Sequence, residues 1–512
     1  MISLAAAKSI MGESQASSPT DIDQQRQSFA IGLPIVIGLL LAVLPFIGKA
    51  AAVPFLLILL PLLLWTAFSD TERSIYVYIT WCWIEGTMRG LFDDNVVSMA
   101  ARDVILATIL IGWLMQRIKT RDRDPLCAPP GSLLVSLFII ATVLQLFNPY
   151  TPGLVQSLAG LRFDLSTVPL FFIAYDVFRR PGQIRNLIVF LTLITLAIAV
   201  VSLVQYVFGR EWTFSHYPGI EYAIDTNAHA AGNAQLAKSA LFRPPGTTMF
   251  GGGSAVFVGL VFPLSFALML LNDKTLSRPW TRLGVAALLL IFVVCVFING
   301  VRLALVESIV GILISSALVG GRTRLRAVLA LFACIVIGLT ALVFSENISN
   351  GGVADRFAST FSDPDQALHS DRASLLDQFS DLVVESPMGI GLGRTGSSVG
   401  RFGDSSESTG FNDYSESYLG NMILETGIIG ALLITLVAIS FLLRGWKGLK
   451  RIYHAEDKIL ASCLLAVIAV IFIDFFYAPV LVAPPGSVLF WMLGPILLRC
   501  YYRSGKSLSD TR

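Results

Sequence analysis

The chain has 512 residues, of which 54% are hydrophobic and only 14% are charged, whereas soluble proteins carry about 25% charged residues. This composition and a mean hydropathy of +0.71 exclude an ordinary soluble domain and predict an integral membrane protein. The net charge of +2 argues against nucleic acid as a partner, because nucleic-acid binding calls for a basic face or stripe.

Apolar stretches separated by short polar connections predict an all-α polytopic protein with about 14 transmembrane helices, since each span needs ~20 mostly apolar residues. The polar start of the chain does not lead directly into a cleavable apolar stretch, so we expect the first span to be retained. The predicted spans cover residues 30–47, 52–68, 74–88, 102–117, 131–147, 161–177, 185–207, 251–271, 282–298, 302–319, 326–344, 419–443, 458–477 and 485–500.

The distribution of Lys and Arg predicts the orientation, because short basic connections stay cytoplasmic. Every second connection carries a basic cluster, whereas connections 148–160, 299–301 and 478–484 carry none. This alternation predicts an even number of spans with both termini inside. The expected organisation is a cytoplasmic N-terminus (1–28), a bundle (29–344) with an outer loop at 208–250, a large outer loop (345–418), C-terminal helices (419–501) and a cytoplasmic tail (502–512).

The large outer loop precedes the last three spans and carries twelve Asp or Glu against four Arg. Apolar residues at helical spacing over 375–383 predict an amphipathic helix on the membrane or the bundle rim. A Gly-rich turn follows at 387–393. The stretch 394–413 is rich in Gly, Ser and Asp, and we expect it to be mobile without a ligand.

Charged residues in or beside a span are costly to bury and point to function by default. They are Glu85, Arg162, Asp164, Asp176, Arg302, Glu307 and Asp474. Arg302 opens a span after the tight Asn299-Gly300 turn, so we expect its guanidinium at the outer face, where it suits a phosphate or diphosphate. The alternative is an arginine that snorkels to lipid head groups.

Two further arginines are candidates for the same outer site. Arg162 lies near the outer end of its span, and neutralisation by Asp164 is the competing interpretation. Arg243 precedes Pro244-Pro245-Gly246, where proline stiffens the chain and glycine allows backbone to approach a ligand closely. The alternative for Arg243 is an ordinary loop leading into a helix.

Other motifs point to no cofactor. The segment Gly391-Leu-Gly-Arg-Thr-Gly396 reads GxGxxG, but no strand precedes it, so we expect no nucleotide there. The histidines show no ligand spacing, and the cysteines form no CxxC pair. We therefore expect neither a metal site nor a disulfide framework.

The run Tyr414–Leu432, taken with the turn at 387–393 and the span start Asn299-Gly-Val-Arg302, resembles the bacterial O-antigen ligase and Wzy-type polysaccharide polymerase family. The resemblance covers about 240–435 in motifs and the whole chain in hydropathy. It implies a metal-independent, inverting glycosyltransferase that uses a polyprenyl-diphosphate-linked glycan, such as an undecaprenyl-diphosphate-linked one, as donor. It also implies that Arg302 and Arg243 hold the leaving diphosphate, with Arg162 as a third candidate.

One departure from the family pattern bears on the acceptor. Where ligases have His-Asn, or Ser or Gln in place of Asn, eleven residues before Gly-x-x-Gly, this chain has Glu416-Ser417, so the expected histidine is missing. A carboxylate can act as general base for a sugar hydroxyl if it lies within hydrogen-bond reach. The change favours a polymerase of exopolysaccharide, capsule or O-antigen over lipid A ligation, with Glu416 as base and Asp413 as the weaker choice. The alternative for Glu416 is an acid favoured by a helix N-terminus.

The expected partners are a lipid-linked glycan donor, a glycan acceptor and membrane lipids, with other envelope polysaccharide-assembly proteins as further candidates. The expected location is the bacterial inner membrane, with the active site facing the periplasm. Two other classes stay open. A lipid-linked oligosaccharide flippase is disfavoured by unequal halves, since transporters usually contain two structural repeats. A scaffold of an envelope complex would tolerate changes at Arg302 and Glu416.

Overall fold

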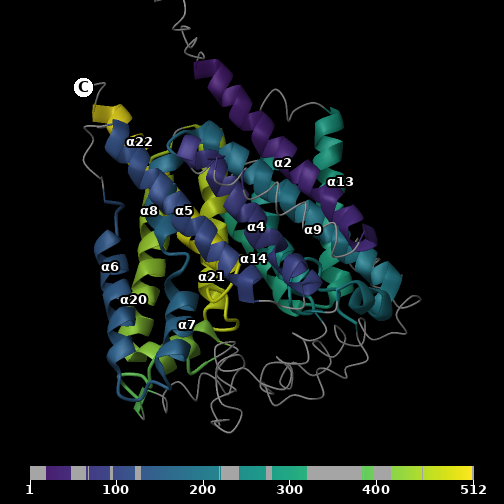
Figure 1. Cartoon of the computed structure of the whole chain (residues 1–512). Coiled ribbons are helices and arrows are strands. Elements are labelled where there is room, and N and C mark those ends of the chain that lie inside the picture. The colour runs from purple at the N-terminus through teal and green to yellow at the C-terminus, as the bar shows by residue number, and fades with distance from the viewer. Residues whose placement is uncertain are drawn as a thin grey trace, which may run out of the picture.

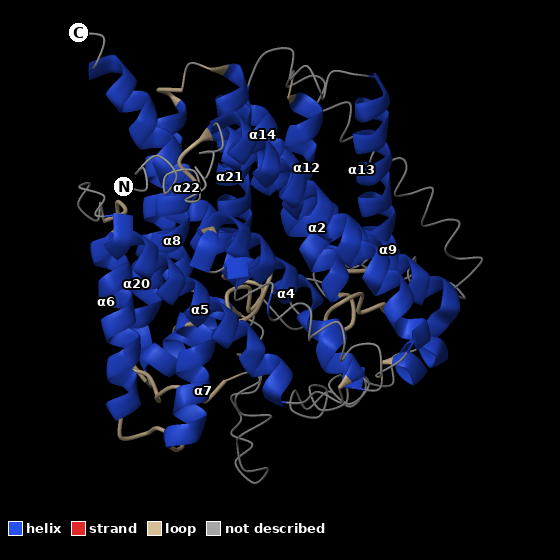
Figure 2. Ribbon diagram, turned by 45° about the horizontal axis from the view of Figure 1, so that its top comes forward, coloured by secondary structure: helices blue, strands red, loops and turns tan. Residues whose placement is uncertain are grey.

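The computed structural model is all-helical over the residues that it describes (Figures 1 and 2). These are residues 19–47, 61, 65–66, 68–92, 96–120, 128–217, 219–220, 242–271, 279–319, 383–384, 386–395, 417–452 and 454–509. The elements are α2 (Pro19–Ile47), α4 (Thr71–Leu91), α5 (Val96–Thr120), α6 (Ser132–Leu144), η1 (Gln145–Phe147), α7 (Leu154–Leu165), α8 (Pro169–Val177), α9 (Pro181–His216), α12 (Gly253–Leu270), α13 (Pro279–Asn299), α14 (Arg302–Val319), α20 (Tyr418–Leu449), α21 (Ala455–Asp474) and α22 (Gly486–Ser509).

Helices coincide with the predicted spans wherever the structure describes them. The span expected at 326–344, nearly all of that at 52–68 and the amphipathic helix expected at 375–383 lie outside the described residues, Val383 excepted. Among the described helices, six segments are long and apolar enough to cross a membrane: Leu154–Val177, Pro181–His216, Gly253–Leu270, Pro279–Asn299, Arg302–Val319 and Tyr418–Leu449. The chain is thus a multi-pass membrane protein by its helices, while the count of 14 spans and their orientation stay predictions.

Several helices depart from the predicted boundaries. Helix α2 begins at Pro19, inside the polar N-terminus expected at 1–28, and α22 continues to Ser509, past the span end expected at 500. The span expected at 161–177 consists of α7 and α8, because Pro169 begins a new helix and has no amide hydrogen to continue the previous one. Helix α9 continues past the expected end at 207 to His216, with a break at Gly209, whose φ is 84°. Helix α20 has a similar break at Gly427, whose φ is 70°. Glycine adopts this left-handed backbone without steric cost.

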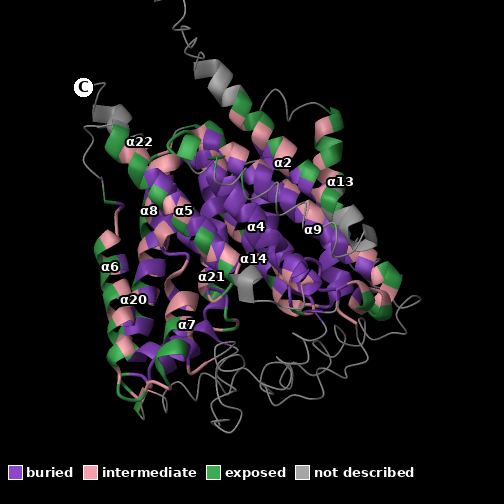
Figure 3. Ribbon diagram, in the orientation of Figure 1, coloured by how far each residue is buried: buried purple, intermediate pink, exposed green. Residues whose placement is uncertain are grey.

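Helix α4 lies in the middle of the bundle (Figure 3). All its residues except Arg73 and Arg89 are buried. Its start is fixed by Asp70, whose side chain accepts a hydrogen bond from the Glu72 amide, and by Arg26 of α2, which forms ion pairs with Asp70 and Glu72. The central helix is therefore held at one end by charge and along its length by packing.

The rim of the bundle exposes apolar side chains instead. Helix α6 exposes Leu133, Leu137, Ile140 and Leu144 along one face, and α13 exposes Trp280 at 82%. Exposed faces of this kind fit a protein whose neighbour is lipid, because large apolar patches on a soluble surface mark interaction sites or aggregation.

The bundle has two opposite sides, and most described helices begin on one side and end on the other. Helix α2 begins and α22 ends on the same side (Figure 1). We call the opposite side the distal side. By chain order and packing, α12, α14, α20 and α22 begin there, and α4, α13 and α21 end there.

Candidate functional site

The loop 242–252, which carries Arg243, is built into the distal side of the bundle. The Gln205 side chain of α9 accepts a hydrogen bond from the Gly246 amide at 2.7 Å and donates one to its carbonyl at 2.9 Å. The Thr87 amide at the end of α4 donates to the Thr247 carbonyl at 3.1 Å. The loop is therefore fixed to two helices at adjacent residues, as a rigid ligand-binding loop requires.

This loop also packs against the turn that starts α14. A Cβ atom built on Gly252 would lie 2.6 Å from Cγ2 of Val301 and 3.7 Å from Cδ of Arg243. The Asn299 side chain in the same turn donates to Ser202 of α9 at 3.1 Å. Gly252 thus lies between the stem of Arg243 and Val301, the residue that precedes Arg302, so the structure brings the two segments that carry these arginines together, and the role of either arginine stays a prediction.

Arg162 has a partner that the sequence did not reveal. Its guanidinium forms an ion pair with Asp103 of α5 and lies 5.7 Å from the centre of the Phe163 ring. Asp164 instead is buried near Glu425 of α20. The competing interpretation of Arg162 as a neutralised residue gains support, but with Asp103 as the counter-charge in place of Asp164.

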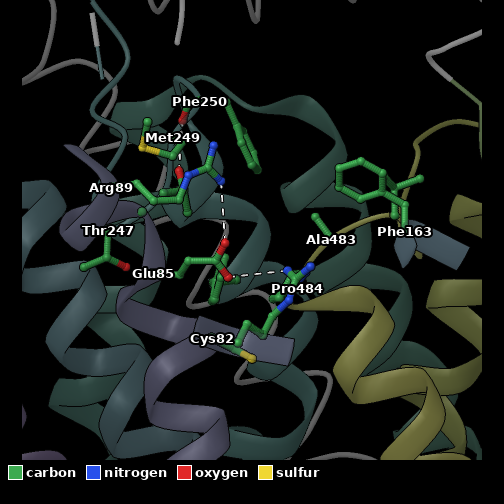
Figure 4. A pocket seen from close by; sticks show the side chains of 14 residues that line it. Cys82, Glu85, Arg89, Phe163, Thr247, Met249, Phe250, Ala483 and Pro484 are labelled. Atoms are coloured by element: carbon green, nitrogen blue, oxygen red, sulfur yellow. Dashed lines mark hydrogen bonds and ion pairs between the residues drawn. The ribbon is translucent and has the colours of Figure 1, made fainter. Parts of the chain in front are cut away.

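A cavity of about 150 Å³ opens beside the loop 242–252 (Figure 4). At its base, Glu85 lies between two arginines, with nitrogen–oxygen distances of 3.6 Å to Arg89 and 3.4 Å to Arg102. The lining residues are Cys82, Glu85, Gly86, Arg89, Arg102, Phe163, Thr247, Thr248, Met249, Phe250, Phe257, Val482, Ala483 and Pro484. The cavity therefore combines a charged base with apolar and aromatic walls.

Sequence reasoning singled out Glu85 but missed both arginines. Arg89 follows Glu85 by four residues, a spacing that predicts a pair on one helix face. Arg102 comes from α5, and no local pattern links it to Glu85. The signal for Arg89 was available, whereas the pairing with Arg102 depends on how two helices pack.

Two pairs of acidic residues lie inside the bundle near its distal side. Glu307 of α14 faces Asp474 of α21, and both are buried. Asp164 of α7 lies near Glu425, as described above. Glu307, Asp474 and Asp164 were expected to matter as charges within spans, but Glu425 was not recognised, since it is one residue inside a longer motif.

Glu425 anchors the turn region 386–395, which is the longest described part of the loop expected at 345–418. It accepts hydrogen bonds from the Thr395 hydroxyl at 2.6 Å and the Thr395 amide at 3.0 Å. The Ile428 amide beyond the α20 break donates to the Pro387 carbonyl at 3.1 Å. The break at Gly427 therefore makes room for this turn region to pack against α20.

The glycines of the formal GxGxxG segment have a packing role here. A Cβ on Gly391 would lie 2.7 Å from the Thr151 methyl carbon, and one on Gly393 would lie 2.7 Å from the Gln156 carbonyl carbon. Both glycines also have positive φ angles. Close approach to the segment around α7 explains these glycines without a nucleotide.

Glu416 and Asp413 lie outside the described residues, as does nearly all of the stretch 394–413 that was expected to be mobile. Their neighbour Ser417 is buried and caps α20, accepting a hydrogen bond from the Gly420 amide at 3.3 Å and donating one to the Phe475 carbonyl at 3.1 Å. The chain after position 416 is thus fixed to the connection between α21 and α22.

Residues 285–435 match the model of the Wzy_C family, described as O-antigen ligase. The matched segment runs from α13 through α14 to the first half of α20 and contains Arg302, Asp413 and Glu416, but not Arg243 or Arg162. No curated protein matches the chain. The resemblance to the O-antigen ligase and Wzy-type family is confirmed over this segment.

Proposed function

We propose that the protein is a polysaccharide polymerase of the bacterial inner membrane, which joins polyprenyl-diphosphate-linked repeat units at the periplasmic face by an inverting, metal-independent reaction. The observation that carries the proposal is the packing of the Arg243 loop against the turn before Arg302. That turn lies inside the segment that matches the O-antigen ligase family, and the Arg243 loop precedes the segment. Fold-level likeness alone would not specify an activity.

The proposed chemistry needs two groups of residues. In the donor, the bond between the anomeric carbon and the diphosphate oxygen breaks, and the leaving diphosphate meets the guanidinium groups of Arg302 and Arg243. Fixed donors of this kind stabilise developing charge most in a partly dry site. The acceptor hydroxyl forms the new bond to the anomeric carbon and gives its proton to Glu416, or to Asp413 as the weaker candidate.

A role for Arg162 in holding the donor is weaker in this proposal than the roles of Arg302 and Arg243. Arg162 and Asp103 form an ion pair, and this pair has no net charge with which to attract a diphosphate. Arg162 would then act on the substrate through Phe163 and the cavity wall, not as a counter-charge for diphosphate.

The second candidate is an O-antigen ligase that transfers glycan to lipid A-core, and the description of the matching family favours it. Glu416 in place of the ligase histidine favours the polymerase. The acceptor discriminates between the two: a ligase leaves glycan on lipid A-core, and a polymerase leaves longer chains on the polyprenyl carrier.

The proposal is tested with Arg302→Ala and Glu416→Ala in the native host, beside Arg282→Ala as a matched control. Arg282 is exposed near the opposite end of α13. Membrane levels are compared by immunoblot, and surface polymer and lipid-linked units are measured in each leaflet. Loss of long polymer with single units accumulating outside, for the first two variants only, supports the proposal. Normal polymer in both refutes the assignment of the site, and accumulation inside indicates a flippase.

A further inference from the structure

The cavity beside the loop 242–252 contains both a carboxylate and guanidinium groups, which narrows the chemistry of its ligand. Glu85 is 6% exposed and Arg102 is 5% exposed, so both charges are held in place by the surrounding helices. Glu85 can accept hydrogen bonds, and the arginines Arg89 and Arg102 can donate them. A ligand that fits must therefore offer both hydrogen-bond donors and acceptors.

A diphosphate fits this base less well than it would fit unpaired arginines, because Arg89 and Arg102 already form ion pairs with Glu85, and Arg102 also forms one with Asp103. The charges of a diphosphate would meet the Glu85 carboxylate, and the repulsion between like charges is large where water is scarce. Hydroxyl groups have no such difficulty, because each can donate to Glu85 and accept from Arg89 or Arg102. Hydrogen bonds to charged groups are also the strong ones. The base of the cavity selects a neutral, polyhydroxylated ligand.

The walls and the volume narrow the class further. Phe163, Phe250 and Pro484 present apolar surfaces around the base (Figure 4), and a sugar ring has apolar C–H faces that pack on such surfaces. A cavity of about 150 Å³ is well below the ~300–1,000 Å³ of sites for drug-sized molecules. The space suits one ring of a longer molecule whose remainder lies outside.

We propose that this cavity is a subsite for one neutral sugar ring of the glycan substrate, with Glu85 as its main hydrogen-bond acceptor and Phe163 as its stacking wall. This rests on the proposed function. The loop 242–252 would then separate two recognition tasks, with Arg243 serving the diphosphate on one side and Thr247 to Phe250 facing the sugar on the other. The Glu85 carboxylate and the pairing of both arginines make this subsite less favourable for the diphosphate than for hydroxyl groups.

The test measures binding of soluble sugars by the full chain in detergent, using saturation-transfer NMR. The probes are neutral methyl pyranosides, namely hexosides, 6-deoxyhexosides and N-acetylhexosaminides, and the competitor is inorganic diphosphate. The variants are Glu85→Gln and Phe163→Ala. Phe147→Ala, which changes a phenylalanine that is 81% exposed on η1, is the matched control.

We expect at least one neutral glycoside to bind the unchanged chain and the Phe147→Ala control alike, with at least tenfold weaker binding to Glu85→Gln and Phe163→Ala. Inorganic diphosphate should not displace it. If Glu85→Gln fails to fold, Phe163→Ala decides the question. Absence of binding by every glycoside, equal binding by Phe163→Ala, or displacement by diphosphate would each overturn the subsite.

Binding to Arg302→Ala separates this proposal from the proposed function. Arg302→Ala can keep sugar binding as a purified chain and also make normal polymer in the host. That result would support the subsite and refute the site assignment of the polymerase. Loss of polymer in Arg302→Ala with no sugar binding in the unchanged chain would leave the polymerase assignment standing while the subsite fails.

Discussion

Gly86 offers the sharpest perturbation of the loop that carries Arg243. A Cβ atom on Gly86 would lie 2.5 Å from the Cα and the carbonyl carbon of Thr248, and closer still to the Thr247 carbonyl oxygen. These are backbone atoms, so the loop itself must move, by about 1 Å to restore ordinary contact distances of ~3.5 Å. Gly86→Ala should therefore displace the loop from α4.

The expected magnitude follows from two opposing effects. Overpacking costs about 1–3 kcal/mol, and replacing a helical glycine by alanine returns about 1 kcal/mol. The net loss of stability is thus at most about 2 kcal/mol. The effect on activity should be larger, because a 1 Å misplacement of groups that position a substrate can cost ~100-fold in rate.

Gly284→Ala is the matched control, since Gly284 is also helical and has nothing within 4 Å of a built Cβ. The assay compares polymer formation per unit of membrane protein, together with thermal unfolding in detergent. We expect a large fall in polymer for Gly86→Ala and none for Gly284→Ala. Equal polymer in both variants, with Gly86→Ala as stable as the control, would refute the reasoning that the loop must shift.

Three further predictions concern stability and are checked by thermal unfolding of the purified chain. Ser417→Ala removes the cap of α20 and its bond to Phe475, so we expect a loss of ~1–2 kcal/mol and reduced polymer; an unchanged Tm would contradict the anchoring of this helix. Glu307→Gln removes one charge from the buried pair with Asp474, so Tm should hold or rise, and a clear fall would show that the charge is needed. Asp176→Asn weakens contacts to Trp113 and two arginines, with an expected loss of ~1–3 kcal/mol but unchanged polymer per folded molecule.

The spans were predictable because lipid leaves backbone groups no partner outside the helix, so each span needs a long apolar run. The breaks within spans were harder to predict from the sequence. Pro169 is a visible signal for the start of α8, whereas a single glycine inside an apolar run, such as Gly209 or Gly427, is compatible with either a helix or a break. Only the packing of residues 386–395 against α20 explains the second of these breaks.

Those residues of the candidate site that lie beside turns could be predicted from the sequence. Arg302 follows Asn299-Gly300 and Arg243 precedes two prolines, so both drew attention from local pattern. The ion pair of Arg162 with Asp103 and that of Glu85 with Arg102 join different helices. Such pairs are determined by helix packing, and neither charge density nor spacing along one helix contains that information.

The first part of α20 is attached at two points to residues that precede it in the chain. Thr395 is bonded to Glu425, and Ser417 caps the same helix, so both ends of segment 396–416 are attached within about 12 Å along one axis, at 1.5 Å per helical residue. Thr395 and Ser417 thus hold two separate parts of the chain at the start of α20, and a change that breaks either attachment would release one of them.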